Sequence, residues 1–184
     1  MLGFEFLDKR PIIIAIAGSN GAGKSTFFAS HLADCGLRFV NADDIALELD
    51  IGPYEAAEAA AAIRESLVER GESFIFETVL SDPVGEKVDL LAGYASRGYE
   101  VVMIFIRIKD AATSIQRVSM RASQGGHDVP DAKLRARFKR TRANLARAIE
   151  RLPHVLVFDN SDLSHPYRLA ERYRDGKRVD KNLC

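Results

Sequence analysis

Short apolar runs alternate along the chain with longer stretches in which apolar residues recur at helical spacing. The run from Pro11 to Ala17 is continuously apolar and rich in β-branched residues, which predicts a strand buried on both faces of a parallel sheet. Further strands are predicted at residues 38–40, 73–79, 99–108 and 154–158, and a closing hairpin at 167–179. Helices are predicted at 24–35, 54–70, 83–97, 110–122 and 131–152.

Strands that alternate with helices indicate an α/β fold in which helices cover both faces of a mainly parallel, five-stranded sheet. Ligands of such folds bind at the carboxyl ends of the strands. The 184 residues suffice for one sizeable core, so a single domain spanning residues 1–184 is expected.

Charge and cysteine content narrow the possible partners. Lys plus Arg and Asp plus Glu both number 26, so net charge gives no reason to expect nucleic acid or a membrane as partner. Cys35 and Cys184 form no disulfide framework, and the run Ile12 to Ala17 is far too short to span a bilayer. With no targeting segment in evidence, a cytoplasmic location is expected.

The segment from Gly18 to Ser25, with the sequence GSNGAGKS, fits the phosphate-binding pattern GxxxxGK[ST]. It follows a predicted buried strand and opens a predicted helix, where backbone N–H groups and the helix N-terminus can face phosphate oxygens. Lys24 is expected to reach the β- and γ-phosphates of ATP, and the Ser25 hydroxyl to hold Mg²⁺. The predicted nucleotide-binding residues are Gly18, Ser19, Asn20, Gly21, Ala22, Gly23, Lys24, Ser25 and Thr26.

Carboxylates follow two predicted strands at the same edge of the sheet. Asp43 comes just after the strand at 38–40, and we predict that it takes the proton of an acceptor hydroxyl and can order Mg²⁺ through water. Asp44 is better explained as a cap of the following helix. Glu77 and Thr78 end the strand at 73–79 and are predicted to bind the acceptor. Glu77 has two further interpretations, a Mg²⁺ ligand through water or a structural partner of a loop amide.

A basic segment, residues 117–142, is predicted to form a mobile lid whose guanidinium groups meet the charge of the transferring phosphoryl group. Arg117 and Arg121 are the predicted catalytic donors, and Arg137, Arg140 and His127 are predicted to contact substrate. The alternative is a solvated helix face, which is favoured for Lys139, Arg142, Arg147 and Arg151. Asn160, after the last parallel strand, is predicted to contact adenine, although a plain turn explains it equally well.

The remaining residues favour a kinase among P-loop proteins. The chain lacks the Asn-Lys-x-Asp motif that reads guanine in GTPases and the Leu-Ser-Gly-Gly signature of ABC ATPases. The fold class expected is therefore the P-loop NTPase class, a nucleoside-kinase-like three-layer sandwich. Two alternatives stay open: a nucleotide-dependent binding or regulatory ATPase without an acceptor, and a polynucleotide 5′-hydroxyl kinase, against which neutral charge argues.

The sequence resembles the zeta-toxin family of P-loop kinases, in particular its short bacterial branch. The resemblance rests on residues 18–26, 40–45 (VNADDI), 76–81 (FETVLS), 114–121 (SIQRVSMR), 125–130 (GGHDVP) and 158–162 (FDNSD). It implies an ATP- and Mg²⁺-dependent kinase with Asp43 as base and Arg117 as a phosphate-contacting lid residue. It further implies a small-molecule acceptor hydroxyl, on a sugar nucleotide in zeta toxins, and a small antitoxin as partner. Where the toxins have a second lid arginine, Arg121, Arg137 or Arg140 is expected to supply the charge.

Overall fold

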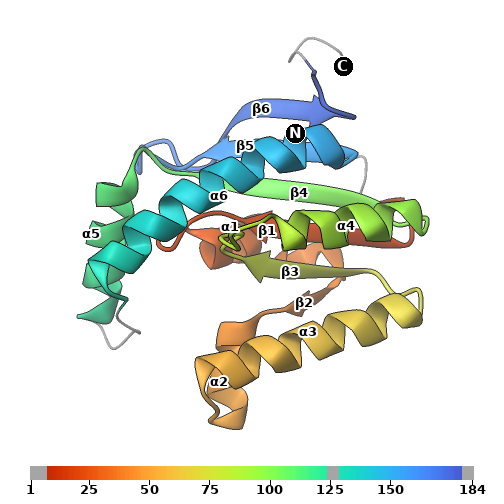
Figure 1. Ribbon diagram of the computed structural model, residues 1–184, viewed down its shortest axis with the longest axis horizontal. Helices are drawn as coiled ribbons and strands as arrows, with labels where there is room; N and C mark the ends of the chain where they lie inside the picture. The colour runs from red at the N-terminus through yellow and green to blue at the C-terminus, as the bar shows by residue number, and fades with distance from the viewer. Residues whose placement is uncertain (1–7, 124–128, 180–184) are drawn as a thin grey trace.

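A seven-stranded, mostly parallel sheet forms the centre of the computed structural model, which describes residues 8–123 and 129–179 (Figure 1). The strands are β1 (Ile12–Ala17), β2 (Arg38–Val40), β3 (Phe74–Thr78), β4 (Glu100–Arg107), β5 (His154–Asp159), β6 (Arg168–Arg174) and β7 (Lys177–Arg178). Their order is β2-β3-β1-β4-β5-β6-β7. Strands β1 to β5 pair in parallel, whereas β6 is antiparallel to β5 and β7 to β6.

The prediction of five strands was wrong, because the C-terminal hairpin joins the main sheet instead of closing beside it. Its turn lies at Asp175 and Gly176, within the hairpin predicted at 167–179, and both residues have positive φ (48° and 76°) as a tight hairpin turn requires.

Helices cover both faces of the sheet, as predicted. They are α1 (Lys24–His31), α2 (Ala42–Leu49), α3 (Pro53–Glu69), α4 (Glu86–Ser96), α5 (Ala111–Ala122) and α6 (Asp131–Arg151), with the short 3₁₀ helix η2 (Ala33–Cys35) after α1. Because side chains alternate along a strand, the strands contribute side chains to two cores, one on each face of the sheet. One core joins the sheet to α3, α4 and α6, and the other joins it to α1. No helix in the described part of the chain is long and apolar enough to cross a membrane.

The segment after β2 differs from the sequence prediction. Residues 42–49 form an additional helix, α2, and its N-cap is Asn41, whose Oδ1 accepts a hydrogen bond from the Asp43 N–H at 3.0 Å. Asp44 lies in the first turn of α2 and is not its cap, so the predicted capping role was wrong. Asp43 occupies the same exposed first turn, where a negative charge is favourable beside the helix N-terminus.

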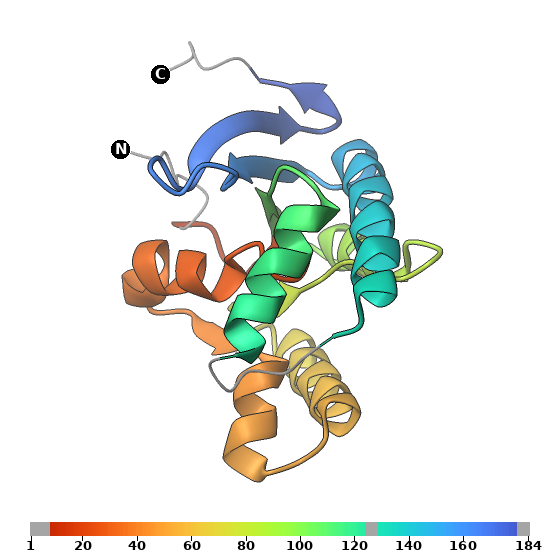
Figure 2. The same ribbon diagram turned by 90° about the vertical axis from the view of Figure 1, so that its left-hand side faces the viewer.

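The carboxyl edge of the parallel strands faces the viewer in Figure 2, with α5 crossing in front of it between α1 and α6. Ser114 and Val118 of α5 are buried, and the Ser114 hydroxyl donates a hydrogen bond at 2.7 Å to the Asn20 carbonyl of the loop after β1. The elements predicted to bind nucleotide, acceptor and phosphate charge therefore meet at one edge of the sheet.

Candidate active site

The loop from β1 to α1 turns where only glycine fits. Gly18, Gly21 and Gly23 all have positive φ, and Gly23 is the left-handed residue that precedes α1. A Cβ on Gly18 would lie 2.6 Å from the Ile106 carbonyl oxygen, and one on Gly23 would lie 2.6 Å from the Tyr167 hydroxyl. Because β4 and the segment after β5 pack so closely against the loop, a residue with a Cβ does not fit at Gly18 or Gly23.

Four consecutive carbonyl oxygens of this loop, those of residues 20 to 23, each accept a hydrogen bond from a side chain outside the loop. The donors, in the order of the carbonyls, are Ser114 Oγ (2.7 Å), Arg117 Nη1 (3.4 Å), Asn160 Nδ2 (2.8 Å) and the Tyr167 hydroxyl (2.9 Å). We name Ser114, Arg117, Asn160 and Tyr167 the carbonyl clamp. With its carbonyls held from outside, the loop is ordered before it binds phosphate oxygens through its remaining backbone N–H groups, the Ala22 N–H being bonded to the Ser19 carbonyl at 3.1 Å.

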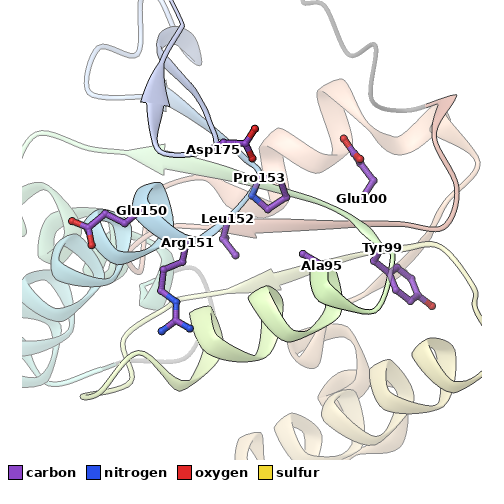
Figure 3. Close-up of a pocket in the computed structure, with 8 residues that line it drawn as sticks. All are labelled: Ala95, Tyr99, Glu100, Glu150, Arg151, Leu152, Pro153 and Asp175. Carbon is purple, nitrogen blue, oxygen red and sulfur yellow. The ribbon is translucent and has the colours of Figure 1, made fainter.

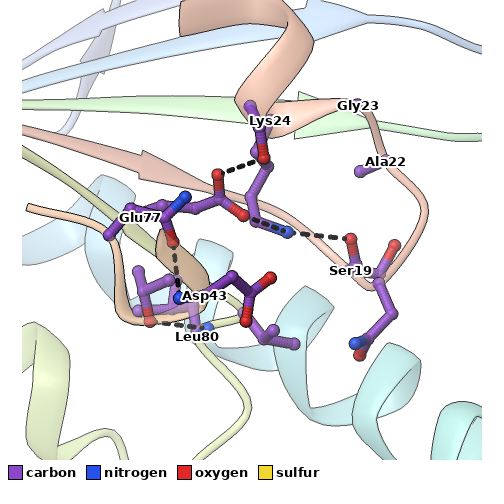
Figure 4. A network of polar contacts seen from close by, with 12 residues as sticks. Ser19, Ala22, Gly23, Lys24, Asp43, Glu77 and Leu80 are labelled. Atoms are coloured by element: carbon purple, nitrogen blue, oxygen red, sulfur yellow. Dashed lines mark hydrogen bonds and ion pairs between the residues drawn. The ribbon is translucent and has the colours of Figure 1, made fainter. Parts of the chain in front are cut away.

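Lys24 and Ser25 both contact the carboxylate of Glu77 at the end of β3. The Ser25 hydroxyl donates to Glu77 Oε2 at 2.7 Å, and the Lys24 Nζ lies 3.5 Å from Glu77 Oε1 (Figure 4). Lys24 also donates to the Ser19 carbonyl at 3.3 Å, and only 6% of its side chain is exposed. Because β1 and β3 are paired neighbours, the first turn of α1 and the last residues of β3 meet directly.

Asp43 follows β2 by three residues, and Val40 at the end of β2 pairs with Phe76, the neighbour of Glu77; Figure 4 draws Asp43 on the side of the site toward the loop. It is exposed, and its position is set by the Asn41 cap at the end of β2. Asp43, Glu77, Lys24 and Ser25 therefore all lie at the carboxyl ends of the three neighbouring strands β2, β3 and β1. A hydroxyl bound between Asp43 and the loop would face a carboxylate on one side and the phosphate-binding loop on the other.

The predicted lid arginines take different positions. Arg117 reaches the Gly21 carbonyl and, at 3.0 Å, the Asn160 carbonyl, so it contacts the loop directly. Arg137 lies 3.5 Å from Asn20 Oδ1, whereas Arg121 is exposed on α5. His127 lies outside the described residues.

Three predicted ligand-binding side chains have structural partners instead. The Thr78 hydroxyl is buried and accepts hydrogen bonds from the Leu80 N–H (3.1 Å) and from Lys87 Nζ (3.2 Å). Arg140 Nε donates to the Ser81 carbonyl at 2.7 Å and holds the segment after β3. Asn160 is 3% exposed and clamps Ala22, so it supports the loop instead of reading an adenine edge.

Oxygen donors suited to Mg²⁺ are present at the loop. Mg²⁺ prefers oxygen ligands and is commonly held by one or two protein groups together with substrate phosphates and water. The Ser25 hydroxyl and the Glu77 carboxylate fit this requirement, with Asp43 beside them. Among the described residues no cluster of three or more His, Cys, Asp or Glu side chains could hold a metal ion alone.

Two cavities lie outside the group formed by Lys24, Ser25, Asp43 and Glu77. One, of about 510 Å³, lies between α6 and the ends of β4 and β5 and reaches Ser19. The other, of about 360 Å³, lies at the amino end of β4, between the ends of α4 and α6 (Figure 3). There Glu100 accepts from Lys9 at 3.0 Å and lies 2.6 Å from His154 Nε2. Neither cavity is lined by the predicted catalytic residues Lys24, Asp43, Arg117 and Arg121.

Residues 53–171 match the zeta toxin family. The chain belongs to that family. No curated protein matches it. Among solved structures, a complex of AvrRxo1-ORF1 and AvrRxo1-ORF2 with ATP is similar with a TM-score of 0.69 and 16% identity, over 97% of this chain and 63% of that one. This chain therefore spans less than two thirds of the length of that relative.

Two further structures share the fold. The PezAT toxin–antitoxin system of Streptococcus pneumoniae has a TM-score of 0.52 and 18% identity, over 83% of this chain and 69% of that one. Shikimate kinase from Acinetobacter baumannii has a TM-score of 0.53 and 15% identity, over 78% of this chain and 82% of that one. The predicted P-loop kinase fold is confirmed by these likenesses.

Sequence reasoning missed two members of the carbonyl clamp, Ser114 and Tyr167. Ser114 lies one turn before Arg117 on α5, so a helix face that carries a predicted site arginine was a usable signal. Tyr167 gave no signal, because its contact with Gly23 depends on a positive-φ turn (54°) between β5 and β6.

Proposed function

We propose that this protein is an ATP-dependent kinase that transfers the γ-phosphoryl group to a hydroxyl of a small molecule. The observation that carries the proposal is the meeting of Lys24, Ser25, Glu77 and Asp43 at the ends of three adjacent strands. A phosphate-binding loop alone serves many functions. An exposed carboxylate next to it, unpaired by any cation within 4.0 Å in the described structure, suits proton abstraction from an acceptor.

In this mechanism the chain's residues position the reactants and move one proton. Backbone N–H groups of the clamped loop and the Lys24 ammonium bind the β- and γ-phosphates. Asp43 accepts the proton of the acceptor hydroxyl while the hydroxyl oxygen forms a bond to the γ-phosphorus. The bond from that phosphorus to the β–γ bridging oxygen breaks, and ADP leaves with the electron pair. Bound Mg²⁺ would neutralise charge on the phosphate oxygens, and Ser25 and Glu77 are the residues that would hold it.

Arginine side chains complete the proposed site. Arg117 stands at the loop itself and Arg137 at Asn20, so both lie close enough to meet negative charge that develops on the transferring group. Arg121 is one turn further along α5 from Arg117 and points to solvent in the described structure, which leaves it available to a bound acceptor or nucleotide.

The comparisons support this proposal without naming the acceptor. ATP accompanies the AvrRxo1 complex, and shikimate kinase shares the fold. The zeta toxin family makes a sugar nucleotide a candidate acceptor. An antitoxin is a candidate partner, because PezAT is a toxin–antitoxin system and AvrRxo1-ORF1 is bound to a second protein.

The test is a transfer assay with γ-labelled ATP and pools of sugar nucleotides, nucleosides, small alcohols and oligonucleotides. Labelled product is expected from a small-molecule pool, and Lys24→Met is the inactive control because it keeps the buried stem and removes the charge. Label on oligonucleotides alone would show a polynucleotide kinase. ATP binding with slow hydrolysis and no labelled acceptor would show a regulatory ATPase.

A further inference from the structure

A half-buried guanidinium on α3 lies over the last residues of β3. The Arg64 Cζ lies 4.9 Å from the centroid of the Phe76 ring, and within the described structure no carboxylate comes within 4.0 Å of this guanidinium. The adjacent Glu65 accepts a hydrogen bond from the Tyr94 hydroxyl. Burial lowers the pKa of Arg64, although it remains charged at neutral pH. Stacking on the ring fixes the plane of the guanidinium and leaves its edge available to an oxyanion.

A second cation lies over the same face of β3. Lys87 of α4 donates to the Thr78 hydroxyl at 3.2 Å, and Thr78 follows Phe76 by two residues. Side chains two residues apart on a strand share a face and stand about 7 Å from each other. Figure 1 shows β3 running between α3, the helix of Arg64, and α4, the helix of Lys87.

The charges around Lys87 are mostly positive. Burial of its amino group lowers its pKa, although the residue as a whole is exposed, and the Arg64 and Arg137 guanidinium groups lower that pKa further. Asp82 opposes this shift. It makes no ion pair with Lys87 within 4.0 Å, and its Oδ1 is buried without a hydrogen-bond partner in the described structure. Cations gathered in this way repel one another, and a bound anion would offset the repulsion.

This cationic pair adjoins the reacting groups. Glu77 and Thr78 both end β3 at its carboxyl edge, with their side chains on opposite faces of the strand, and Arg137, whose charge also acts on Lys87, reaches the phosphate-binding loop at Asn20. We propose that Arg64 and Lys87 form an anion subsite for the acceptor, so that the acceptor carries a phosphate or carboxylate group besides the hydroxyl that receives phosphate. This inference rests on the proposed kinase function. An arginine edge and a lysine ammonium suit either oxyanion, and the experiments distinguish phosphate from carboxylate.

The binding experiment uses protein whose loop is filled with a non-hydrolysable ATP analogue, titrated separately with inorganic phosphate and with malonate. Arg64→Gln and Lys87→Met are each expected to weaken binding of the preferred anion about 10-fold or more. Arg70→Gln is the matched control, because Arg70 lies at the exposed end of the same helix and pairs with Glu72. Equal affinities in all four proteins, or no saturable binding of either anion, would overturn the subsite.

The transfer experiment separates failure of the subsite from failure of the kinase assignment. Phosphorylated, carboxylated and neutral hydroxyl compounds are offered as three pools, and Arg64→Gln is expected to raise the acceptor KM about 10-fold with little change in ATP KM. Preferential phosphorylation of neutral acceptors, unaffected by Arg64→Gln, overturns the subsite and leaves the kinase standing. Absence of transfer to every pool, with anion binding still dependent on Arg64 and Lys87, overturns the acceptor role and the kinase assignment together.

Discussion

The Ser25 hydroxyl donates a hydrogen bond of 2.7 Å to the carboxylate of Glu77, which joins the first turn of α1 to the end of β3. The same carboxylate lies 3.5 Å from the Lys24 ammonium. Glu77 thus connects the two side chains of the loop that the proposed function assigns to phosphate and metal. This position gives Glu77 a role in the proposed site that is separate from that of Asp43, the proposed base: it holds the Lys24 and Ser25 side chains.

Glu77→Gln should raise the Mg²⁺ concentration needed for half-maximal activity about 10-fold, since the amide still accepts from Ser25 but carries no charge to attract the cation. Activity measured over a Mg²⁺ titration at saturating ATP checks this. Glu86→Gln, at the exposed start of α4, is the control. An unchanged Mg²⁺ dependence would leave Glu77 with a purely structural role between Ser25 and Lys24.

Tyr167→Phe should weaken ATP binding about 3- to 10-fold, because it removes one hydrogen bond to the Gly23 carbonyl while the ring stays packed against Phe27. The turnover rate at saturating ATP should change little, since the clamp organises the loop before chemistry. Calorimetric ATP titration and steady-state kinetics separate the two effects. Tyr54→Phe, at a 77% exposed residue, is the control. A loss of turnover without a loss of affinity would contradict the role assigned to the clamp.

The sequence predicted those parts of the site that depend on neighbouring residues in the chain. An apolar strand followed by a glycine loop located β1 and the phosphate-binding loop, and strand ends located Asp43 and Glu77. The carbonyl clamp was not predicted as a set, because Ser114, Asn160 and Tyr167 reach the loop from residues far along the chain. The burial of Thr78 was not predicted, because it depends on the way the next helix brings Lys87 to the Thr78 hydroxyl.

Two elements of the fold have hydrophobic patterns too weak to predict them fully from the sequence. The helix α2 has only eight residues and none of them is fully buried, so its apolar face gives little signal. The strand β6, next to the edge strand β7 and with the sequence RLAERYR, is charged and only partly buried, so it was recognised as half of a hairpin but not as part of the main sheet. Both lie at the margins of the sheet, where burial constrains the sequence least.

Mild acidification should lower the free energy of unfolding, because His154 at the start of β5 has a lowered pKa in the folded protein. Burial lowers the pKa of this imidazole more than the nearby Glu100 raises it. Between that lowered pKa and the unfolded value of about 6.5, the unfolded chain binds more protons than the folded one, so stability decreases as pH falls through this window.

Urea unfolding at pH 7.5 and 5.5 measures this effect. The loss of stability between the two should be smaller in His154→Gln than in the parent protein. His165→Gln changes a histidine whose side chain is 82% exposed and should behave like the parent. An equal loss in all three proteins would assign the pH dependence to other groups.

Asp43→Asn should reduce phosphoryl transfer roughly 10²-fold or more, because the amide keeps the size of the side chain but cannot take the acceptor's proton. ATP affinity should change far less, since Asp43 lies at the start of α2 and not in the phosphate-binding loop. The cap of α2 does not depend on this carboxylate, because the Asp43 contribution is its N–H to Asn41 Oδ1. Stability is therefore expected to stay close to that of the parent.

Asp44→Asn is the matched control, since it neutralises the next carboxylate in the same exposed helical turn. Measured side by side, the two variants should bind ATP alike, and only Asp43→Asn should lose transfer to the acceptor that the screen identifies. Raising the pH should not rescue Asp43→Asn, because an amide has no proton to lose in that range. If instead Asp43→Asn transfers phosphate as fast as the parent, Asp43 is not the base, and the carboxylate of Glu77, held between Ser25 and Lys24, becomes the next residue to substitute.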